Sequence, residues 1–207
     1  MKNKLFVLCL ILIILGGASE CVMSQWCSTY IEQSLQIDKI YGDLFGLALF
    51  GIMLGFGRSF YAKWGKNVIN FVLFGFIGAF ICYLIAIISP LPIIGLIACA
   101  ITGLFVSMLW PGSLILSEKF VLNGGVIMYA IMASGGDFGA GICPQLMGII
   151  TDGVLNNSHL MEFANKINLA PDQFALKAAL LIASIFPFIA IFIAIYIKKG
   201  LKNEIQQ

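Results

Sequence analysis

The feature that most constrains this chain is a long apolar run with one carboxylate at its centre. The run covers residues 124–150, and Asp137 stands 13 residues from either end. At about 1.5 Å per residue the run would be roughly 40 Å long as a helix, more than the roughly 30 Å of a bilayer core. A charge at that depth costs on the order of 2.5–3.5 kcal/mol on insertion scales. The run therefore predicts a membrane-spanning helix around a specialised acidic group.

Asp137 has two interpretations. We expect no cationic side chain within an apolar span near it, so burial favours its protonated form. A protonated aspartate could lock two helices together through hydrogen bonds, or it could exchange a proton during transport. Three neighbouring glycines, Gly135, Gly136 and Gly139, would let another backbone approach closely enough to supply hydrogen-bond partners.

Composition places the whole chain in a membrane. Of its 207 residues 60% are hydrophobic and 11% are charged, whereas a soluble domain has about 25% charged residues. The six cysteines form no C-x-x-C pair and the chain has one histidine, which argues against a zinc or redox site. No nucleophile–base pair or phosphate-binding loop is visible, so we expect no enzyme, no metal, no cofactor and no nucleic-acid partner.

Hydropathy divides the chain into six apolar segments, which predict an all-α membrane protein. We expect one domain over residues 1–207, embedded in the lipid bilayer, with residues 151–173 as a polar loop. The expected spans are residues 5–34, 43–58, 68–88, 93–117, 124–150 and 174–197.

The amino-terminal segment has a second interpretation as a secretory signal. Lys2 and Lys4 precede an apolar stretch, and Cys21 resembles a lipoprotein cleavage site. Glu20 directly before that cysteine argues against cleavage, because a small residue is needed there. Five further apolar segments also follow it. We therefore expect a first spanning helix instead.

That first helix carries a polar stripe. Residues 23–35 contain no glycine or proline to end it, and Glu20, Ser24, Ser28 and Glu32 recur every four residues on one face. The stripe predicts that this face contacts something other than lipid. For Glu20 the alternatives are a carboxylate that faces a cavity and one that bonds a neighbouring helix.

Two prolines lie inside apolar spans. In residues 110–112, Pro111 removes a backbone hydrogen bond, which predicts a bend in the fourth span beside Trp110. Pro144 lies in the fifth span, after Asp137. We expect both prolines, with the glycines around Asp137, to shape the helices.

The charge distribution predicts an orientation. With the amino terminus inside, nine Lys and Arg residues fall on the inner side and three on the outer side. This bias favours a multi-pass protein of the cell membrane with both termini in the cytoplasm. The inner residues are Lys2, Lys4, Arg58, Lys63, Lys66, Lys119, Lys198, Lys199 and Lys202.

Several stretches together resemble the carboxy-terminal half of major facilitator superfamily transporters, and most closely the bacterial fucose-permease-like branch. The resemblance covers nearly the whole chain in order. The stretches are residues 17–20, 23–26, 42–44, 55–66, 109–112 and 135–139, followed by Pro144 and Gly148.

The resemblance implies six of twelve spans, arranged as two inverted three-helix repeats that form one wall of a solute cavity. It implies a half-size secondary transporter of a small polar solute such as a sugar. The missing wall would come from a second copy or a separately encoded amino-terminal half. A truncated or split-gene remnant that does not transport is the alternative.

The resemblance also implies roles for particular residues. Candidates for a solute or proton site are Asp137, Glu20, Ser24, Gln25 and Trp110. The segment with Arg58, Lys63 and Lys66 resembles a degenerate cytoplasmic gating loop, in which Gly57 replaces the usual acidic residue.

Overall fold

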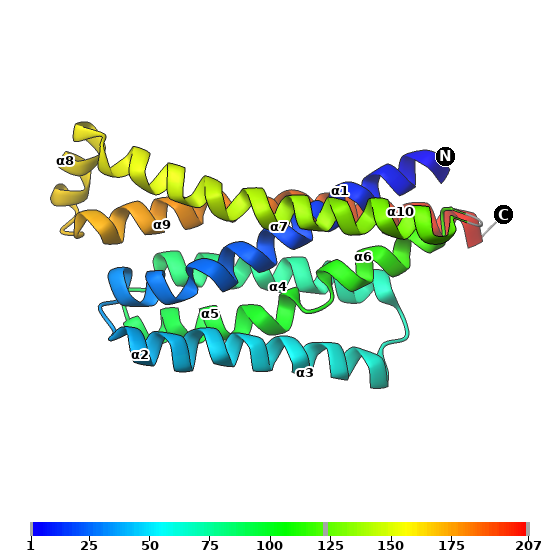
Figure 1. The fold of residues 1–207 in the computed structure, drawn as a ribbon, viewed down its shortest axis with the longest axis horizontal. Coiled ribbons are helices and arrows are strands. Elements are labelled where there is room, and N and C mark those ends of the chain that lie inside the picture. The colour runs from blue at the N-terminus through cyan, green and yellow to red at the C-terminus, as the bar shows by residue number, and fades with distance from the viewer. Residues whose placement is uncertain (1, 122–123, 206–207) are drawn as a thin grey trace.

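The computed structural model describes residues 2–121 and 124–205, which form helices joined by short connections (Figure 1). Two short segments, η1 and η2, are wound as π-helix. The elements are α1 (Lys2–Thr29), η1 (Tyr30–Ser34), α2 (Lys39–Tyr41), η2 (Gly42–Ala48), α3 (Leu49–Trp64), α4 (Val68–Ile88), α5 (Pro92–Val106), α6 (Leu109–Glu118), α7 (Gly125–Leu155), α8 (Ser158–Lys166), α9 (Pro171–Ala183) and α10 (Ile185–Ile205).

Six helical segments of the described chain are long and apolar enough to cross a membrane, which confirms the expected number and the all-α class. The second, fifth and sixth extend beyond their expected bounds, because hydropathy marks the lipid-embedded part of a helix and not its polar ends. The segments are Lys4–Ser34, Lys39–Trp64, Val68–Ile88, Pro92–Glu118, Gly125–Leu155 and Pro171–Leu201.

Two expected loops are mostly helical. Residues 57–64 belong to α3, so the basic connection shrinks to residues 65–67. The expected loop at residues 151–173 contains the end of α7, the whole of α8 and the start of α9. In α8 the Asn157 side chain accepts hydrogen bonds from the amides of His159 and Leu160, which is a normal helix N-cap. The polar composition of these residues suggested a loop, but the Asn157 cap stabilises the start of a helix there.

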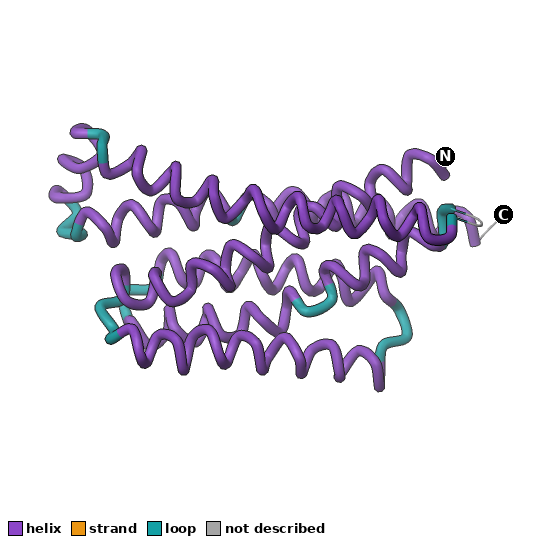
Figure 2. The backbone as a smooth tube through the Cα atoms, viewed as in Figure 1, coloured by secondary structure: helices purple, strands orange, loops and turns teal. Residues whose placement is uncertain are grey.

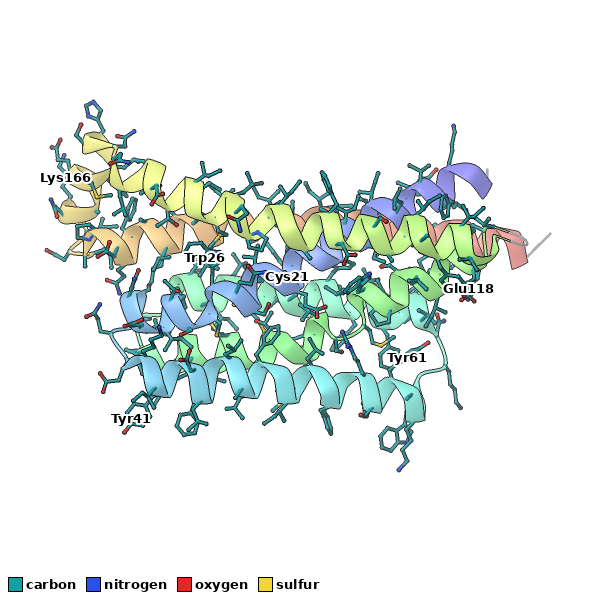
Figure 3. The ribbon with its side chains drawn as sticks, in the orientation of Figure 1. Cys21, Trp26, Tyr41, Tyr61, Glu118 and Lys166 are labelled. Carbon is teal, nitrogen blue, oxygen red and sulfur yellow. The ribbon has the colours of Figure 1, made fainter. Side chains whose placement is uncertain are left out.

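Both termini lie at one end of the bundle (Figure 1). The α3–α4 and α6–α7 connections lie at the same end, whereas α8 lies at the other. Figure 3 places Glu118 at the terminal end and Lys166 at the opposite end. The segments that carry most of the lysines therefore share one end of the bundle.

The helices form two groups that α1 connects (Figure 1). α1 packs mainly against α7 and also contacts α6 and α10, while α5 packs against α3 and α4. Two buried tyrosines fix α4 to the first span: the Tyr83 hydroxyl donates to the Ser19 carbonyl at 2.9 Å, and the Tyr30 hydroxyl donates to the Ala86 carbonyl. These bonds hold the middle and the far end of the first span against α4.

The sixth span contains a lysine with a structural partner. Lys177 lies in α9, and its Nζ donates to the Ser89 carbonyl at 3.3 Å. Ser89 is the residue that ends α4, so the cation meets free carbonyl groups and the negative end of a helix dipole. The contact explains how a charged residue is tolerated near the end of an apolar helix.

We expect Lys177→Met to lower the stability of the purified protein, because methionine keeps the apolar stem but not the cation. The loss should be about 1 kcal/mol, typical of one hydrogen bond from a charged group near a helix end. Thermal unfolding in detergent measures it. Lys166→Met is the control, since its pair with Glu162 is exposed and should contribute little. Equal melting temperatures for the two variants would contradict the role of Lys177.

Candidate functional site: an ion pair at a broken helix

The fourth span is interrupted in the middle of the bundle. α5 ends at Val106 and α6 begins at Leu109, and Figure 2 shows this connection away from both ends of the molecule. Pro111 explains the position, because it has no N–H to donate to the carbonyl four residues earlier, that of Ser107. The bend expected at Pro111 therefore appears one turn before it, and it leaves the Ser107 carbonyl without its usual helical donor.

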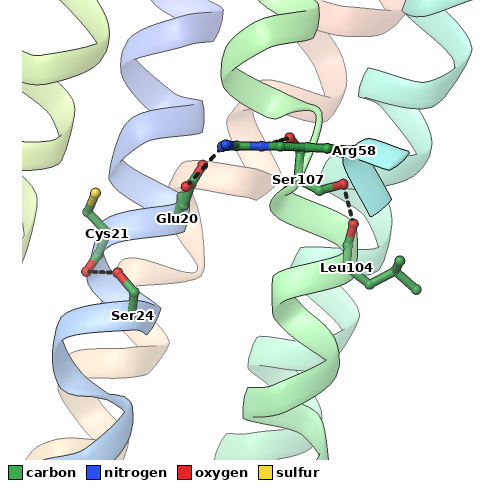
Figure 4. A network of polar contacts seen from close by, with 6 residues as sticks. All are labelled: Glu20, Cys21, Ser24, Arg58, Leu104 and Ser107. Carbon is green, nitrogen blue, oxygen red and sulfur yellow. Dashed lines mark hydrogen bonds and ion pairs between the residues drawn. The ribbon is translucent and has the colours of Figure 1, made fainter. Parts of the chain in front are cut away.

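Arg58 supplies the missing donor (Figure 4). Its Nε donates to the Ser107 carbonyl oxygen at 3.2 Å, and its Nη2 lies 3.6 Å from Glu20 Oε1. A guanidinium carries several N–H groups in a rigid fork, so one side chain can serve both partners. The ion pair thus joins α1, α3 and the α5–α6 break.

Gly57 brings the arginine to this position. A Cβ atom at Gly57 would collide with the Ser107 side chain and would lie 2.9 Å from the Leu104 carbonyl oxygen. Only glycine therefore lets α3 approach the end of α5 so closely. In the family resemblance, Gly57 stands where an acidic residue is usual. In the structure, Gly57 lets α3 pack closely against the end of α5.

The expectation that Arg58 lies in a cytoplasmic loop is wrong. Arg58 belongs to α3, inside the span Lys39–Trp64, and not to a cytoplasmic loop. A signal was present in the sequence: no proline interrupts residues 43–64, so the helix could continue past Arg58.

Glu20 lies at the centre of this arrangement. Its side chain is only 15% exposed, Oε1 faces Arg58, and Oε2 is buried without a hydrogen-bond partner among the described residues. Burying a carboxylate oxygen without a hydrogen-bond donor costs free energy, and the cost is larger when the carboxylate is charged. Ser24, one turn further along, bonds the Cys21 carbonyl of its own helix at 3.3 Å. The polar stripe therefore has no single partner: Glu20 is in an ion pair, Ser24 bonds its own helix, the Ser28 hydroxyl has no hydrogen-bond partner among the described residues, and Glu32 is exposed.

Small residues let α1 and α7 cross in close contact. Cβ atoms at Gly17 or Gly139 would collide with backbone carbonyls of the facing helix, those of Gly136 and Ile14. The Trp110 indole packs against Gly136. Gly135 instead meets the side chain of Leu10, at 2.6 Å from an added Cβ. The glycines thus allow close helix contact, as small residues do in other membrane bundles.

Asp137 is exposed on α7, between the two crossing residues Gly136 and Gly139. Residues seven and eleven positions along a helix share a face, so Asp137 lies on the same side of α7 as Pro144 and Gly148. It is not among the residues that pair with Arg58. The structure therefore separates the two acidic candidates: Glu20 is paired and largely buried, and Asp137 is exposed on the bundle.

A small cavity lies between α1 and α7. Its volume is about 240 Å³, and its lining residues are Gln25, Trp26, Thr29, Pro144, Gln145 and Gly148. The Trp26 indole donates to the Pro144 carbonyl at 2.9 Å, and Figure 3 shows Trp26 on α1. The amides of Gln25 and Gln145 are exposed. Sequence reasoning assigned Gln25 to a site but missed the role of Trp26, whose polar N–H required a partner.

A second cavity, of about 460 Å³, opens beside Arg58. α3 and the region around the break form its walls. The lining residues are Arg58, Tyr61, Met108, Trp110, Pro111, Leu114 and Ile115. Trp110 thus contributes to this cavity and also to the contact with Gly136. The volume is in the range of pockets that bind small molecules.

The other two expected gating residues lie apart from this site. Lys63 is in the last turn of α3 with its Nζ 4.6 Å from the Trp64 ring centre, and Lys66 is in the connection that follows. Both are exposed. Arg58, Lys63 and Lys66 therefore do not form one group, because a continuous helix separates the arginine from the helix end.

We expect Gly139→Ala to destabilise the protein, because the added methyl group meets a backbone carbonyl that cannot move alone. A loss of about 1–3 kcal/mol is typical of overpacking, and thermal unfolding in detergent would measure it. Gly141→Ala is the matched control on the same helix, since its Cβ would meet open space. A Gly139→Ala variant as stable as the control would show that the α1–α7 crossing is adaptable.

Comparison with known proteins adds no family assignment. No protein-family model matches the chain, and no curated protein or solved structure shows significant similarity to it. The geometry of the ion pair, the helix break and the exposed polar residues therefore carries the functional argument.

Proposed function

We propose that this chain is half of a secondary active transporter that moves a small polar solute by alternating access. The resemblance to the carboxy-terminal half of major facilitator superfamily transporters suggested this function. A sugar or a similar polar metabolite is the substrate class that the resemblance implies. The proposal depends most on one observation, the Glu20–Arg58 pair at the helix break.

The depth of this pair supports the proposal. At about 1.5 Å per residue, Glu20 lies roughly 24 Å from the start of the span Lys4–Ser34 and roughly 21 Å from its end. Ionisable groups at such depth usually mark solute or ion pathways. Interrupted helices at membrane depth are likewise tolerated where they are buried in protein or line a cavity. Both features occur together here.

The exposed polar surface supports a partner half. Gln25, Asp137 and Gln145 are exposed on α1 and α7 within apolar spans. Lipid would leave these groups without hydrogen bonds, whereas a facing half would enclose them in a polar cavity. We propose a second copy of the chain or a separately encoded amino-terminal half as that partner.

We propose that the six spans are two inverted three-helix repeats, the first ending with α4 and the second beginning with α5. Three crossings reverse the direction of a chain, so a second similar unit enters the membrane from the opposite side. The position of both termini at one end of the bundle agrees with this arrangement (Figure 1).

We propose the cell membrane as the location, with both termini in the cytoplasm, because the lysine-rich segments share the terminal end. In intact cells, a membrane-impermeant thiol reagent should then label His159→Cys from outside but not Lys66→Cys. Both side chains are exposed, one at each end of the bundle. A cysteine-free parent chain provides the background. Labelling of Lys66→Cys alone would reverse the orientation.

Transport can be tested in proteoliposomes with an imposed proton gradient and a panel of radiolabelled neutral monosaccharides. We expect gradient-driven uptake, and we expect Glu20→Gln to reduce it by about 10-fold or more, because the amide cannot ionise beside Arg58. Glu32→Gln, which changes an exposed carboxylate further along the same span, should leave uptake unchanged. Normal uptake in Glu20→Gln would remove the ion pair from the mechanism.

The same assay separates the two interpretations of Asp137. Loss of uptake in Asp137→Asn, with assembly and thermal stability preserved, would assign it a proton-transfer role. Full uptake would leave it a hydrogen-bonding residue. Absence of uptake by the parent chain, together with no self-association in crosslinking, would favour the non-transporting alternative.

A further inference from the structure

We propose that Arg58 is a positioning residue that holds a hinge in the fourth span at its present angle. The inference extends the proposed function, but its test requires neither a solute nor a partner half. It starts from the backbone chemistry of Pro111, which leaves one carbonyl of the interrupted helix free.

The break has the properties of a hinge. Gly112 N donates to the Met108 carbonyl at 2.9 Å, and this bond begins the regular pattern of α6. The backbone of Met108 itself leaves helical geometry, with φ −106° and ψ 4°. The Ser107 hydroxyl bonds back to the Leu104 carbonyl at 2.7 Å, so it does not bridge the break. Arg58 is therefore the donor that the structure provides for the Ser107 carbonyl.

The two sides of the break have different neighbours. α5 packs mainly against α3 and α4, whereas α6 packs mainly against α1 and less extensively against α4. Arg58 extends from α3, bonds the carbonyl at the break, and reaches Glu20 on α1 (Figure 4). One side chain thus connects α3, which packs on α5, to α1, the main neighbour of α6, at the point where the helix backbone is weakest.

The α1 end of this connection is fixed. The Ser19 carbonyl, adjacent to Glu20, accepts the buried Tyr83 hydroxyl of α4. If the ion pair is lost, we therefore expect the backbone at the break to move more than α1. Trp110 lies on α6 just after the break and packs against Gly136 of α7. The angle that Arg58 sets consequently determines where this indole meets α7.

Hydrogen–deuterium exchange with mass spectrometry tests the hinge on the purified protein in nanodiscs. In Arg58→Gln, the amides of residues 104–116 should exchange roughly 10-fold faster or more, because a bond from a charged donor is lost. Amides in α4 should keep their rates. Lys63→Gln is the matched control: it removes a cation from the same helix without touching the break, and it should change nothing in this segment.

Pro111→Ala distinguishes the hinge from general destabilisation. Alanine restores an N–H that can donate to the Ser107 carbonyl, so the break no longer needs Arg58. In this background, Arg58→Gln should change exchange of residues 104–116 by less than about 2-fold. Equal acceleration with and without Pro111→Ala would overturn the proposal, as would unchanged exchange in Arg58→Gln alone.

Arg58→Lys provides a second variant if the glutamine variant does not fold. Lysine keeps the positive charge beside Glu20, but its single ammonium cannot reproduce the fork that serves two partners. We expect the segment to exchange faster again, and Pro111→Ala to restore slow exchange. A lysine variant with parental rates would show that charge alone holds the segment, and the hinge role of the guanidinium would be wrong.

Discussion

The central constraint in this structure is one backbone carbonyl with no amide to bond. Within a membrane, an unpaired carbonyl costs several kcal/mol, and water is not available to satisfy it. Pro111 creates this situation at Ser107, and Arg58 resolves it at 3.2 Å. The guanidinium then needs a counter-charge, which Glu20 supplies, and Gly57 provides the space for the approach of α3. One missing N–H thus accounts for three residues on two helices: Arg58 and Gly57 of α3, and Glu20 of α1.

The sequence predicted the parts of this arrangement that depend on neighbouring residues, and not the parts that depend on contacts between distant segments. Hydropathy and helix signals act locally, so the six spans and the position of the bend near Pro111 could be predicted. The pairing of Glu20 with Arg58 could not, because it depends on how three helices cross. The basic composition of residues 57–66 also suggested a loop, although no proline interrupts the segment and α3 continues to Trp64.

Asp137 and Glu20 illustrate the same difference. Position within an apolar run identified both as exceptional, and this required only the sequence. Their surroundings differ because of tertiary packing: Glu20 faces an arginine from another helix, while Asp137 emerges beside the Gly136–Trp110 contact onto an open face. Depth in the membrane is therefore predictable from one chain, whereas the partner of a buried charge is not.

The three tryptophans of the chain have three distinct environments. Trp26 donates to a carbonyl of α7, Trp110 lies against a glycine beside the helix break, and Trp64 is exposed at the end of α3. Indole emission depends on hydrogen bonding, polarity and nearby quenchers. The protein consequently carries its own optical reporters for the α1–α7 contact, the break and the end of the second span. Replacing two of the three tryptophans with phenylalanine would isolate the emission of the third without an added dye.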